Sequence, residues 1–149
     1  MRIVSAMLVL IMLCSCSSSV KKPPVITDGF SCTVTAEYED SQTEFKLKKE
    51  SETITVEYLS PSDIKGMVVD ISPAGKYVSY EGITTALNDD LLSASLIGAV
   101  IDMLNYNFET AEYNSGEYDC GAFKVSLFSD GRISSVNFSQ FNCRCYFNY

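Results

Sequence analysis

Residues 30–38 have the sequence FSCTVTAEY, in which apolar and polar side chains alternate. The apolar positions are Phe30, Cys32, Val34, Ala36 and Tyr38. A period of two sends alternate side chains to opposite faces of a strand, so one face is expected to be buried and the other exposed to water. This stretch predicts a β-strand and sets the expectation of a mainly β fold.

The same alternation returns several times along the chain. Further strands are predicted over 43–49, 53–59, 67–72, 76–80, 122–128, 132–139 and 142–149. Asp130-Gly131 lies between two of these stretches and is a strong signal for a short hairpin turn. Residues 81–83 are expected to bend out of a strand, and the polar run 105–121 is expected to be a loop. About eight antiparallel strands are therefore predicted, each with one wet face.

Residues 91–108 have a different period. Apolar side chains recur on one helical stripe at Leu92, Leu96, Val100, Met103 and Leu104. Asp102 carries the one charge of residues 91–104. One long and largely buried helix is therefore predicted, lying across the inner face of the sheet.

The first sixteen residues have the pattern of an export signal. Arg2 is followed by the apolar run 3–13, which is shorter than the ~20 residues that a membrane-spanning helix needs. The sequence Leu13-Cys14-Ser15-Cys16 then resembles a bacterial lipobox. Cys16 fits the lipidated position, whereas Cys14 fits less well because Leu13 would take the place of the small residue. The alternative is an ordinary signal peptide cleaved nearby, which would leave the protein soluble.

The lipobox resemblance implies a division of the chain. Residues 1–15 are expected to be a signal peptide, residues 16–29 a lipidated N-terminus and tether, and residues 30–149 a single domain. Two acyl chains, such as palmitate, on Cys16 would anchor the protein stably in a membrane. The expected location is extracytoplasmic, on the cell membrane.

Composition excludes several classes of function. A chain of 149 residues suits one domain, and its net charge of −8 argues against general nucleic-acid binding. The sequence contains no His, which excludes a Ser-His-Asp triad and a His-ligated zinc site. Phosphate-binding loops and nucleophile elbows are absent from the sequence. We therefore expect no enzyme activity, no cofactor and no metal site.

The order of these elements resembles the lipoprotein-carrier fold of the LolA/LolB kind. The resemblance lies in an extended meander, the segment LSPSDIKG (59–66), a hairpin with the sequence VVDISPAGKYVSYEGI (68–83), an apolar helix and further strands. It extends to uncharacterised lipoproteins of low-GC Gram-positive bacteria. The resemblance implies a curved antiparallel sheet that forms an open half-barrel, with the long apolar helix packed on its concave face. The mature chain lacks an early arginine like the one that holds the lid of the carriers, so the transfer activity is not carried over.

Four cysteines remain beyond the signal region. They are Cys32, Cys120, Cys143 and Cys145. A disulfide between Cys143 and Cys145 would be strained on one strand. A bond from Cys32 to one of that pair is the alternative, provided that the first and last strands adjoin. Equally, Cys32, Cys143 and Cys145 can be small buried apolar residues. The C-x-C spacing without His is a weak metal signal.

Aromatic residues suggest the function. The chain has nine Tyr and eight Phe, which build a core and can also line an apolar pocket. The candidate ligand-binding residues are Leu92, Leu96, Val100, Met103, Leu104, Phe45, Val56 and Tyr58. Binding of a lipid or another hydrophobic ligand between sheet and helix is the leading hypothesis. The alternative is an envelope lipoprotein that binds a partner protein and has a closed core.

Overall fold

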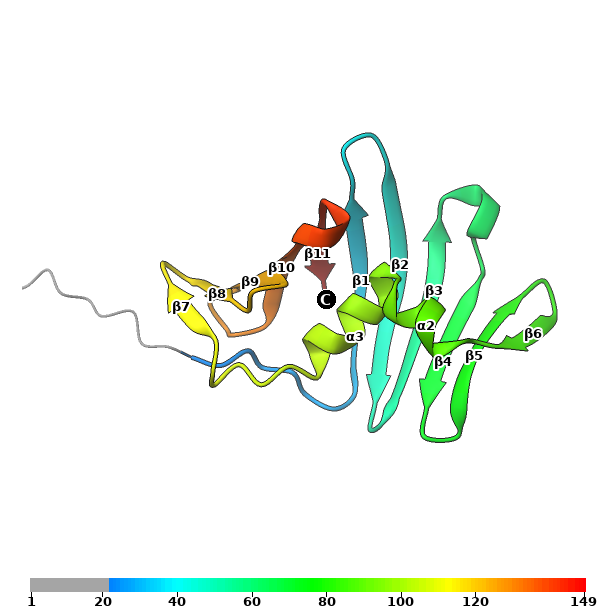
Figure 1. The fold of residues 1–149 in the computed structure, drawn as a ribbon, viewed down its shortest axis with the longest axis horizontal. Coiled ribbons are helices and arrows are strands. Elements are labelled where there is room, and N and C mark those ends of the chain that lie inside the picture. Colours follow the sequence, from blue (N-terminus) through cyan, green and yellow to red (C-terminus); the bar gives the residue numbers. More distant parts are fainter. Residues whose placement is uncertain (1–21) are drawn as a thin grey trace, which may run out of the picture.

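The computed structural model describes residues 22–149. The predicted signal peptide, Cys14 and Cys16 lie outside the described residues. In the described part of the chain, the strands form one antiparallel sheet in the order β6-β5-β4-β3-β2-β1-β11-β10-β9-β8-β7 (Figure 1). The strands are β1 (Phe30–Glu37), β2 (Gln42–Glu50), β3 (Thr53–Ser60), β4 (Val68–Ser72), β5 (Gly75–Tyr80), β6 (Ile83–Ala86), β7 (Glu112–Asn114), β8 (Glu117–Asp119), β9 (Phe123–Leu127), β10 (Ile133–Phe138) and β11 (Cys143–Asn148).

One long-range pairing holds the sheet together. Strands β1 to β6 follow one another in space as in sequence, and so do β7 to β11. The two series join where β1 pairs with β11, with Val34 opposite Phe147 and Ala36 opposite Cys145. The first predicted strand therefore lies at the centre of the sheet. Short 3-10 turns, η1 (Ser62–Ile64) and η2 (Ser139–Phe141), complete the connections after β3 and β10.

The alternation in β1 has the expected result, because Val34 and Ala36 are fully buried while Glu37 is exposed. The bend and the long loop predicted from the sequence are wrong in part, since residues 83–86, 112–114 and 117–119 form strands. Glu81-Gly82 and Ser115-Gly116 have successive positive φ angles of 50° and 82° and of 52° and 89°. Such pairs make tight two-residue turns that return the chain as a hairpin.

The predicted fold class is wrong in its helix. No single long apolar helix covers residues 91–108 in the described chain. Two short helices take its place, α2 (Asp89–Ser93) and α3 (Leu96–Leu104), and they accompany an open eleven-stranded antiparallel sheet. The residues beyond α3 continue as irregular chain and the β7–β8 hairpin.

Ser95 explains the break between the two helices. Its backbone is extended, with φ −101° and ψ 160°, so the helical path stops there. The Ser95 hydroxyl donates to the Leu92 carbonyl oxygen at 2.6 Å and accepts from the Gly98 backbone N–H at 3.1 Å. The same side chain thus closes α2 and caps the N-terminus of α3. Both helices bury one face, so the apolar pattern of the sequence continues through the break. For this reason the periodicity of apolar residues does not reveal that the helix is interrupted.

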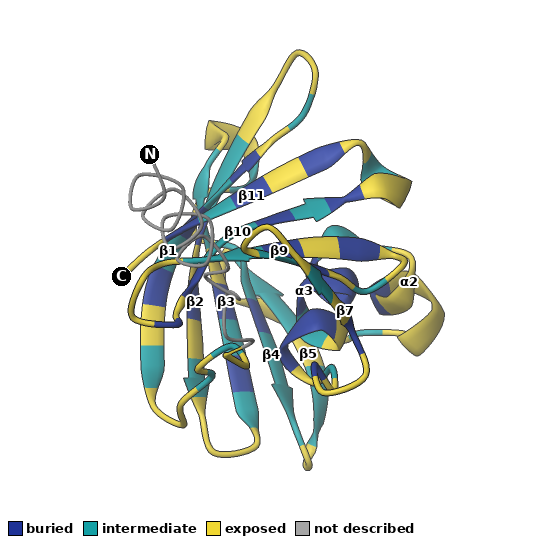
Figure 2. Ribbon diagram, turned by 90° about the vertical axis from the view of Figure 1, so that its left-hand side faces the viewer, coloured by how far each residue is buried: buried dark blue, intermediate teal, exposed yellow. Residues whose placement is uncertain are grey.

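The core lies between α3 and the sheet. Figures 1 and 2 show α3 lying across one face of the sheet, and the buried stretches of the strands turn toward it. Val100 and Met103 of α3 are fully buried, and they belong to the same hydrophobic cluster as Phe45 of β2 and Phe147 of β11. None of the described helices is both long enough and apolar enough to cross a membrane.

The segment 22–29 follows the domain closely. The Val25 backbone N–H donates to the Gly131 carbonyl oxygen at 2.9 Å, and the Tyr118 hydroxyl donates to the Lys22 carbonyl oxygen. Asp28 forms an ion pair with Lys49 at 2.8 Å. Residues 22–29 therefore lie against both the β1–β2 hairpin and the β9–β10 hairpin.

Candidate functional site

The eight predicted ligand-binding residues gather in the core. Four of them are fully buried, namely Phe45, Val56, Val100 and Met103. Leu92 and Leu104 are also buried, whereas Tyr58 and Leu96 are partly buried and pack against the same cluster. The structure thus brings these residues together, and their side chains fill the space between α3 and the sheet. Leu92 and Leu104 additionally reach clefts at opposite ends of the helical layer.

The first of these clefts lies beside residues 22–29, and we call it the N-terminal cleft. It has a volume of about 290 Å³ and lies where the beginnings of β1 and β10 and the end of β11 meet the C-terminal end of α3. Its lining residues are Val25, Ile26, Thr27, Phe30, Ser31, Leu104, Arg132, Ile133, Phe147 and Tyr149. Seven of these ten residues are aliphatic or aromatic, so the cleft is mainly apolar.

Arg132 supplies the positive charge of the N-terminal cleft. Its guanidinium carbon lies 4.5 Å from the centre of the Tyr149 ring and 6.0 Å from that of Phe128. Its Nε donates to an Asp130 carboxylate oxygen at 2.7 Å. The backbone N–H of Arg132, and then its guanidinium, lower the pKa of the Asp130 carboxyl group. Burial raises the pKa of the Tyr149 hydroxyl to about 12, so this hydroxyl stays neutral at physiological pH.

Sequence reasoning missed Arg132 as a site residue. The Asp130-Gly131 turn was predicted, and it places Arg132 at the beginning of β10. What the sequence could not supply is the approach of Tyr149 and of residues 25–27, which are far away in the chain. One signal was available, because Arg132 and Arg144 are the two arginines of the described chain.

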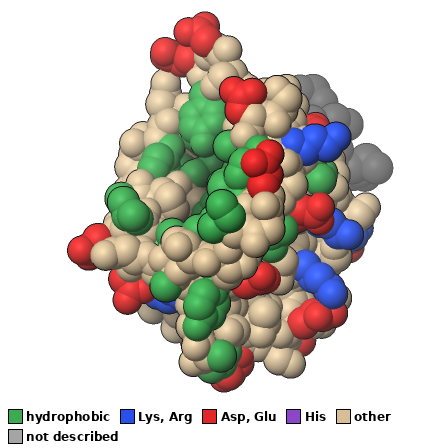
Figure 3. Space-filling model, turned by 90° about the vertical axis from the view of Figure 1, so that its right-hand side faces the viewer, with side chains coloured by type: hydrophobic (Ala, Val, Ile, Leu, Met, Phe, Trp, Pro, Cys, Tyr) green, Lys and Arg blue, Asp and Glu red, His purple; other side chains and the backbone are tan. Residues whose placement is uncertain are grey.

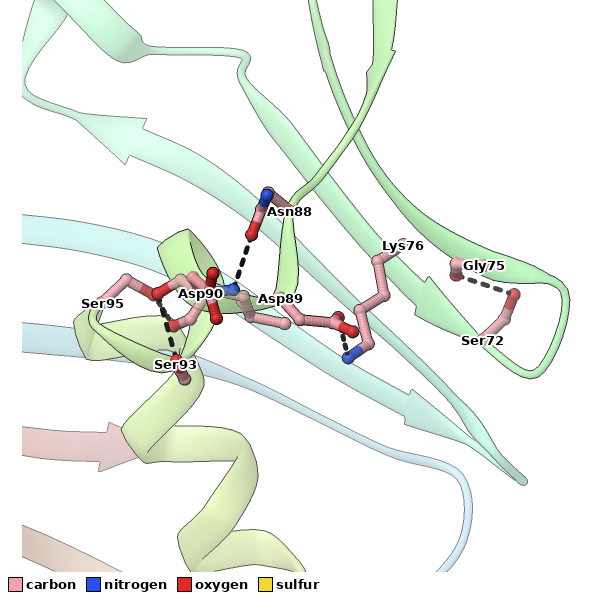
Figure 4. A network of polar contacts seen from close by, with 9 residues as sticks. Ser72, Gly75, Lys76, Asn88, Asp89, Asp90, Ser93 and Ser95 are labelled. Atoms are coloured by element: carbon pink, nitrogen blue, oxygen red, sulfur yellow. Dashed lines mark hydrogen bonds and ion pairs between the residues drawn. The ribbon is translucent and has the colours of Figure 1, made fainter.

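The second cleft lies between the helices and the sheet, and we call it the helix groove. It has a volume of about 390 Å³. Its lining residues are Ile71, Lys76, Asp89, Asp90, Leu92, Ser93, Gly98, Ile101 and Asp102. Figure 4 shows Lys76 reaching Asp89 across this groove, at 2.6 Å between Nζ and the carboxylate. Asn88 caps α2 by accepting from the Asp90 backbone N–H at 2.7 Å.

Exposed apolar side chains accompany the helix groove on this side of the molecule. Figure 3 shows hydrophobic side chains gathered around a hollow, with acidic side chains between them. Ile83 of β6 is 74% exposed and Leu91 of α2 is 68% exposed. Tyr77 of β5 is also exposed. Strand β6 is one of the two edge strands of the sheet, and all four of its residues are exposed.

The four described cysteines are thiols in the structure. Cys145 lies opposite Ala36 of β1, which places Cys32 about 13 Å away along the strand. A disulfide needs Cα atoms within ~7 Å, so the alternative of a bond from Cys32 to the last-strand pair does not fit this register, although the two strands adjoin. Burial raises the pKa of Cys32 to about 12. Cys120 follows β8 and is partly exposed.

Comparison with known proteins gives a likeness of fold. No protein-family model matches the sequence, and no curated protein matches it. The chain is similar to the crystal structure of a LolA superfamily protein from Nitrosomonas europaea, with a TM-score of 0.48 and 11% identity, over 84% of this chain and 85% of that one. It is also similar to an uncharacterised conserved protein from Thermus thermophilus, with a TM-score of 0.49 and 10% identity, over 81% and 76% of the two chains. A LolA superfamily protein is thus among the solved structures that this chain resembles, and the likeness concerns the fold alone.

Proposed function

We propose that this protein is an extracytoplasmic lipoprotein, anchored through Cys16, that binds a small amphiphile with an anionic headgroup in the N-terminal cleft. The proposed location rests on the apolar run 3–13 and on Leu13-Cys14-Ser15-Cys16. The proposed activity is binding of a hydrophobic ligand and includes no chemical step.

One observation carries the proposal for the ligand: a mainly apolar cleft has a guanidinium group at its wall. Ile26, Phe30 and Ile133 offer an apolar surface to a hydrocarbon chain. The side-chain hydrogen bond from Arg132 to Asp130 uses the Nε–H group. The terminal nitrogens of a guanidinium group can donate to a second acceptor. A carboxylate or phosphate headgroup is the acceptor that matches this fork.

The dimensions of the cleft restrict the ligand. A volume of about 290 Å³ lies at the lower end of the range for small-molecule pockets. A single short acyl chain is therefore the expected occupant, rather than a complete phospholipid with two chains. The hydroxyl of Tyr149 is neutral at physiological pH, so this hydroxyl adds no negative charge that would repel an anionic headgroup.

Isothermal titration with two amphiphiles of equal chain length tests the ligand. Decanoate is expected to bind with saturation, whereas decyltrimethylammonium is expected to bind much more weakly, because its cationic head meets Arg132. Equal affinity for both would reduce the site to a general apolar surface. Absence of binding by either amphiphile would contradict the proposal.

Metabolic labelling tests the anchor separately. Cells that express the full chain are given an alkyne-bearing fatty acid, and label on the wild-type protein is expected to disappear in Cys16→Ser while persisting in Cys14→Ser. Label that persists in Cys16→Ser, or that never attaches, contradicts lipidation at Cys16. This result would leave the test of the cleft unaffected.

A second candidate function is the binding of a partner envelope protein at the β6 side of the helix groove. The observation that favours it is the exposure of Ile83 and Leu91 beside the free edge of the sheet. An edge strand can accept another strand, and apolar side chains provide specificity. A photo-crosslinking residue at Ile83 or Leu91 is expected to capture one envelope protein, and the same residue at Ser41 is not. Equal capture from all three positions would contradict this function.

A further inference from the structure

Two thiols meet on the inner face of β11. Cys143 and Cys145 alternate with the exposed Arg144, so both side chains point toward the same face of the sheet. Their sulfur atoms are 4.0 Å apart. Both residues are buried, and they are well separated from Cys32. The C-x-C spacing alone is a weak signal, and the distance between the sulfurs is the observation that the structure adds.

A phenol group completes this cluster. Glu37 pairs with Arg144 across β1 and β11, so the next residue, Tyr38, lies beside Cys143. Tyr38 and Cys143 line the same surface hollow. Tyr38 therefore brings a phenol group near the two sulfurs.

The cluster has access to solvent on one side. Cys143 and Tyr38 form part of the wall of a surface hollow of about 310 Å³. Glu37 and Arg144 also line this hollow, so its rim carries one charge of each sign. Cys145 lies behind Cys143 and is fully buried. A small cation can therefore approach Cys143 first, whereas a bulky reagent has no direct path to Cys145.

We propose that Cys143 and Cys145 bind one copper(I) ion, or another soft monovalent cation of the same class, through their two sulfurs. With metal–thiolate bonds of about 2.3 Å, sulfurs 4.0 Å apart make an angle of about 120° at the ion. This angle belongs to a three-coordinate site, in which one position is left for a third ligand. Thiolates are soft ligands that favour copper(I).

The number of ligands distinguishes copper(I) from zinc. A structural zinc site takes four protein ligands. Among residues 22–149 the structure contains no group of three or more Cys, His, Asp or Glu residues that could hold a metal. Two thiols and one phenol are too few for a tetrahedral zinc site but suffice for a low-coordinate soft ion. Binding releases one proton from each thiol, so the ion and two neutral thiols give a bis-thiolate complex and two protons, with no change of oxidation state.

A competition titration tests the proposal. The full chain is used with Cys14→Ser and Cys16→Ser, which remove the other C-x-C pair, and copper(I) is supplied without oxygen as its complex with the chromophoric chelator bicinchoninate. The protein is expected to withdraw one copper(I) per chain. The additional change Cys143→Ser or Cys145→Ser should abolish this withdrawal, whereas Cys32→Ser and Cys120→Ser, the matched controls, should retain it.

X-ray absorption of the copper-loaded chain keeps the proposal testable even where a serine variant fails to fold. Two sulfur neighbours at about 2.3 Å are expected around copper. Coordination by nitrogen and oxygen alone, or no withdrawal of copper(I) from the chelator, would overturn the proposal. Equal loss of binding in the Cys32→Ser or Cys120→Ser control would also overturn it. A disulfide between Cys143 and Cys145 that persists in the presence of a reductant would do the same.

Discussion

The guanidinium of Arg132 lies 4.5 Å from the centre of the Tyr149 ring, at the wall of the N-terminal cleft. Asp130 holds the same guanidinium from the other side through Nε. The arginine is therefore oriented before any ligand arrives. Because orienting a side chain costs conformational entropy, an oriented Arg132 binds an anionic headgroup at a lower cost.

Removal of the charge of Arg132 is expected to weaken the binding of decanoate. Arg132→Gln loses a charge-assisted hydrogen bond, which contributes about 1.5–3 kcal/mol, or ~10- to ~150-fold in Kd. The free energy of unfolding should change by less than about 1 kcal/mol, since the pair with Asp130 is exposed to solvent. Titration calorimetry and urea unfolding measure the two effects. Lys124→Gln, at an exposed ion pair on β9, is the control and should leave decanoate binding unchanged.

Filling the N-terminal cleft is expected to abolish binding. Thr27 lines the cleft, is exposed and lies before β1, so Thr27→Trp places an indole ring at the cleft without replacing a core residue. The control is Thr85→Trp on the exposed strand β6, which should bind decanoate like the wild type. Undiminished binding by Thr27→Trp in titration calorimetry would place the ligand elsewhere.

The sequence predicts the centre of the sheet better than its edges. Strands such as β1 were predicted because one face is buried and the other is wet, a local pattern. Strand β6 lacks this pattern, because all its residues are exposed, and β7 and β8 have three residues each. The sequence signals that could have revealed these hairpins were the glycines of Glu81-Gly82, before β6, and of Ser115-Gly116, between β7 and β8.

The candidate site was only partly accessible from sequence for a related reason. Leu104 was predicted because it lies on an apolar stripe. Arg132, Tyr149 and Val25 meet only after β1 has paired with β11 and the segment 22–29 has come against Gly131. No local pattern encodes contacts of such long range. The filling of the space under α3 by large side chains likewise depends on packing rather than on periodicity.

Gly98 is expected to be required where α2 meets α3. A Cβ atom at this position would lie 2.1 Å from the Leu92 carbonyl oxygen, far inside van der Waals contact. In an ordinary helix interior, Gly→Ala stabilises by about 1 kcal/mol, but here overpacking should reverse the sign and destabilise by about 1–3 kcal/mol. Urea unfolding of Gly98→Ala gives the value, with the exposed Ser93→Ala as control. A stabilised Gly98→Ala would contradict the close approach of the two helices.

Stability is expected to fall in alkaline solution because of Cys32. Burial raises its pKa from about 9 to about 12, so between these values the unfolded chain loses a proton that the folded chain keeps. This contribution to stability is complete below pH 9 and is lost as the pH rises toward 12. The free energy of unfolding of Cys32→Ala should therefore fall less steeply than that of the wild type, by about 1.4 kcal/mol per pH unit. Parallel slopes in urea unfolding would show that the Cys32 thiol ionises freely in the folded protein.

The central claim is that the N-terminal cleft binds one anionic amphiphile. The most direct test is native mass spectrometry of the full chain, which is purified without detergent and then mixed with decanoate. The account predicts one bound decanoate per wild-type chain, and no bound decanoate on Thr27→Trp under the same conditions. Equal occupancy of wild type and Thr27→Trp, or a wild-type chain that carries no decanoate, would contradict it.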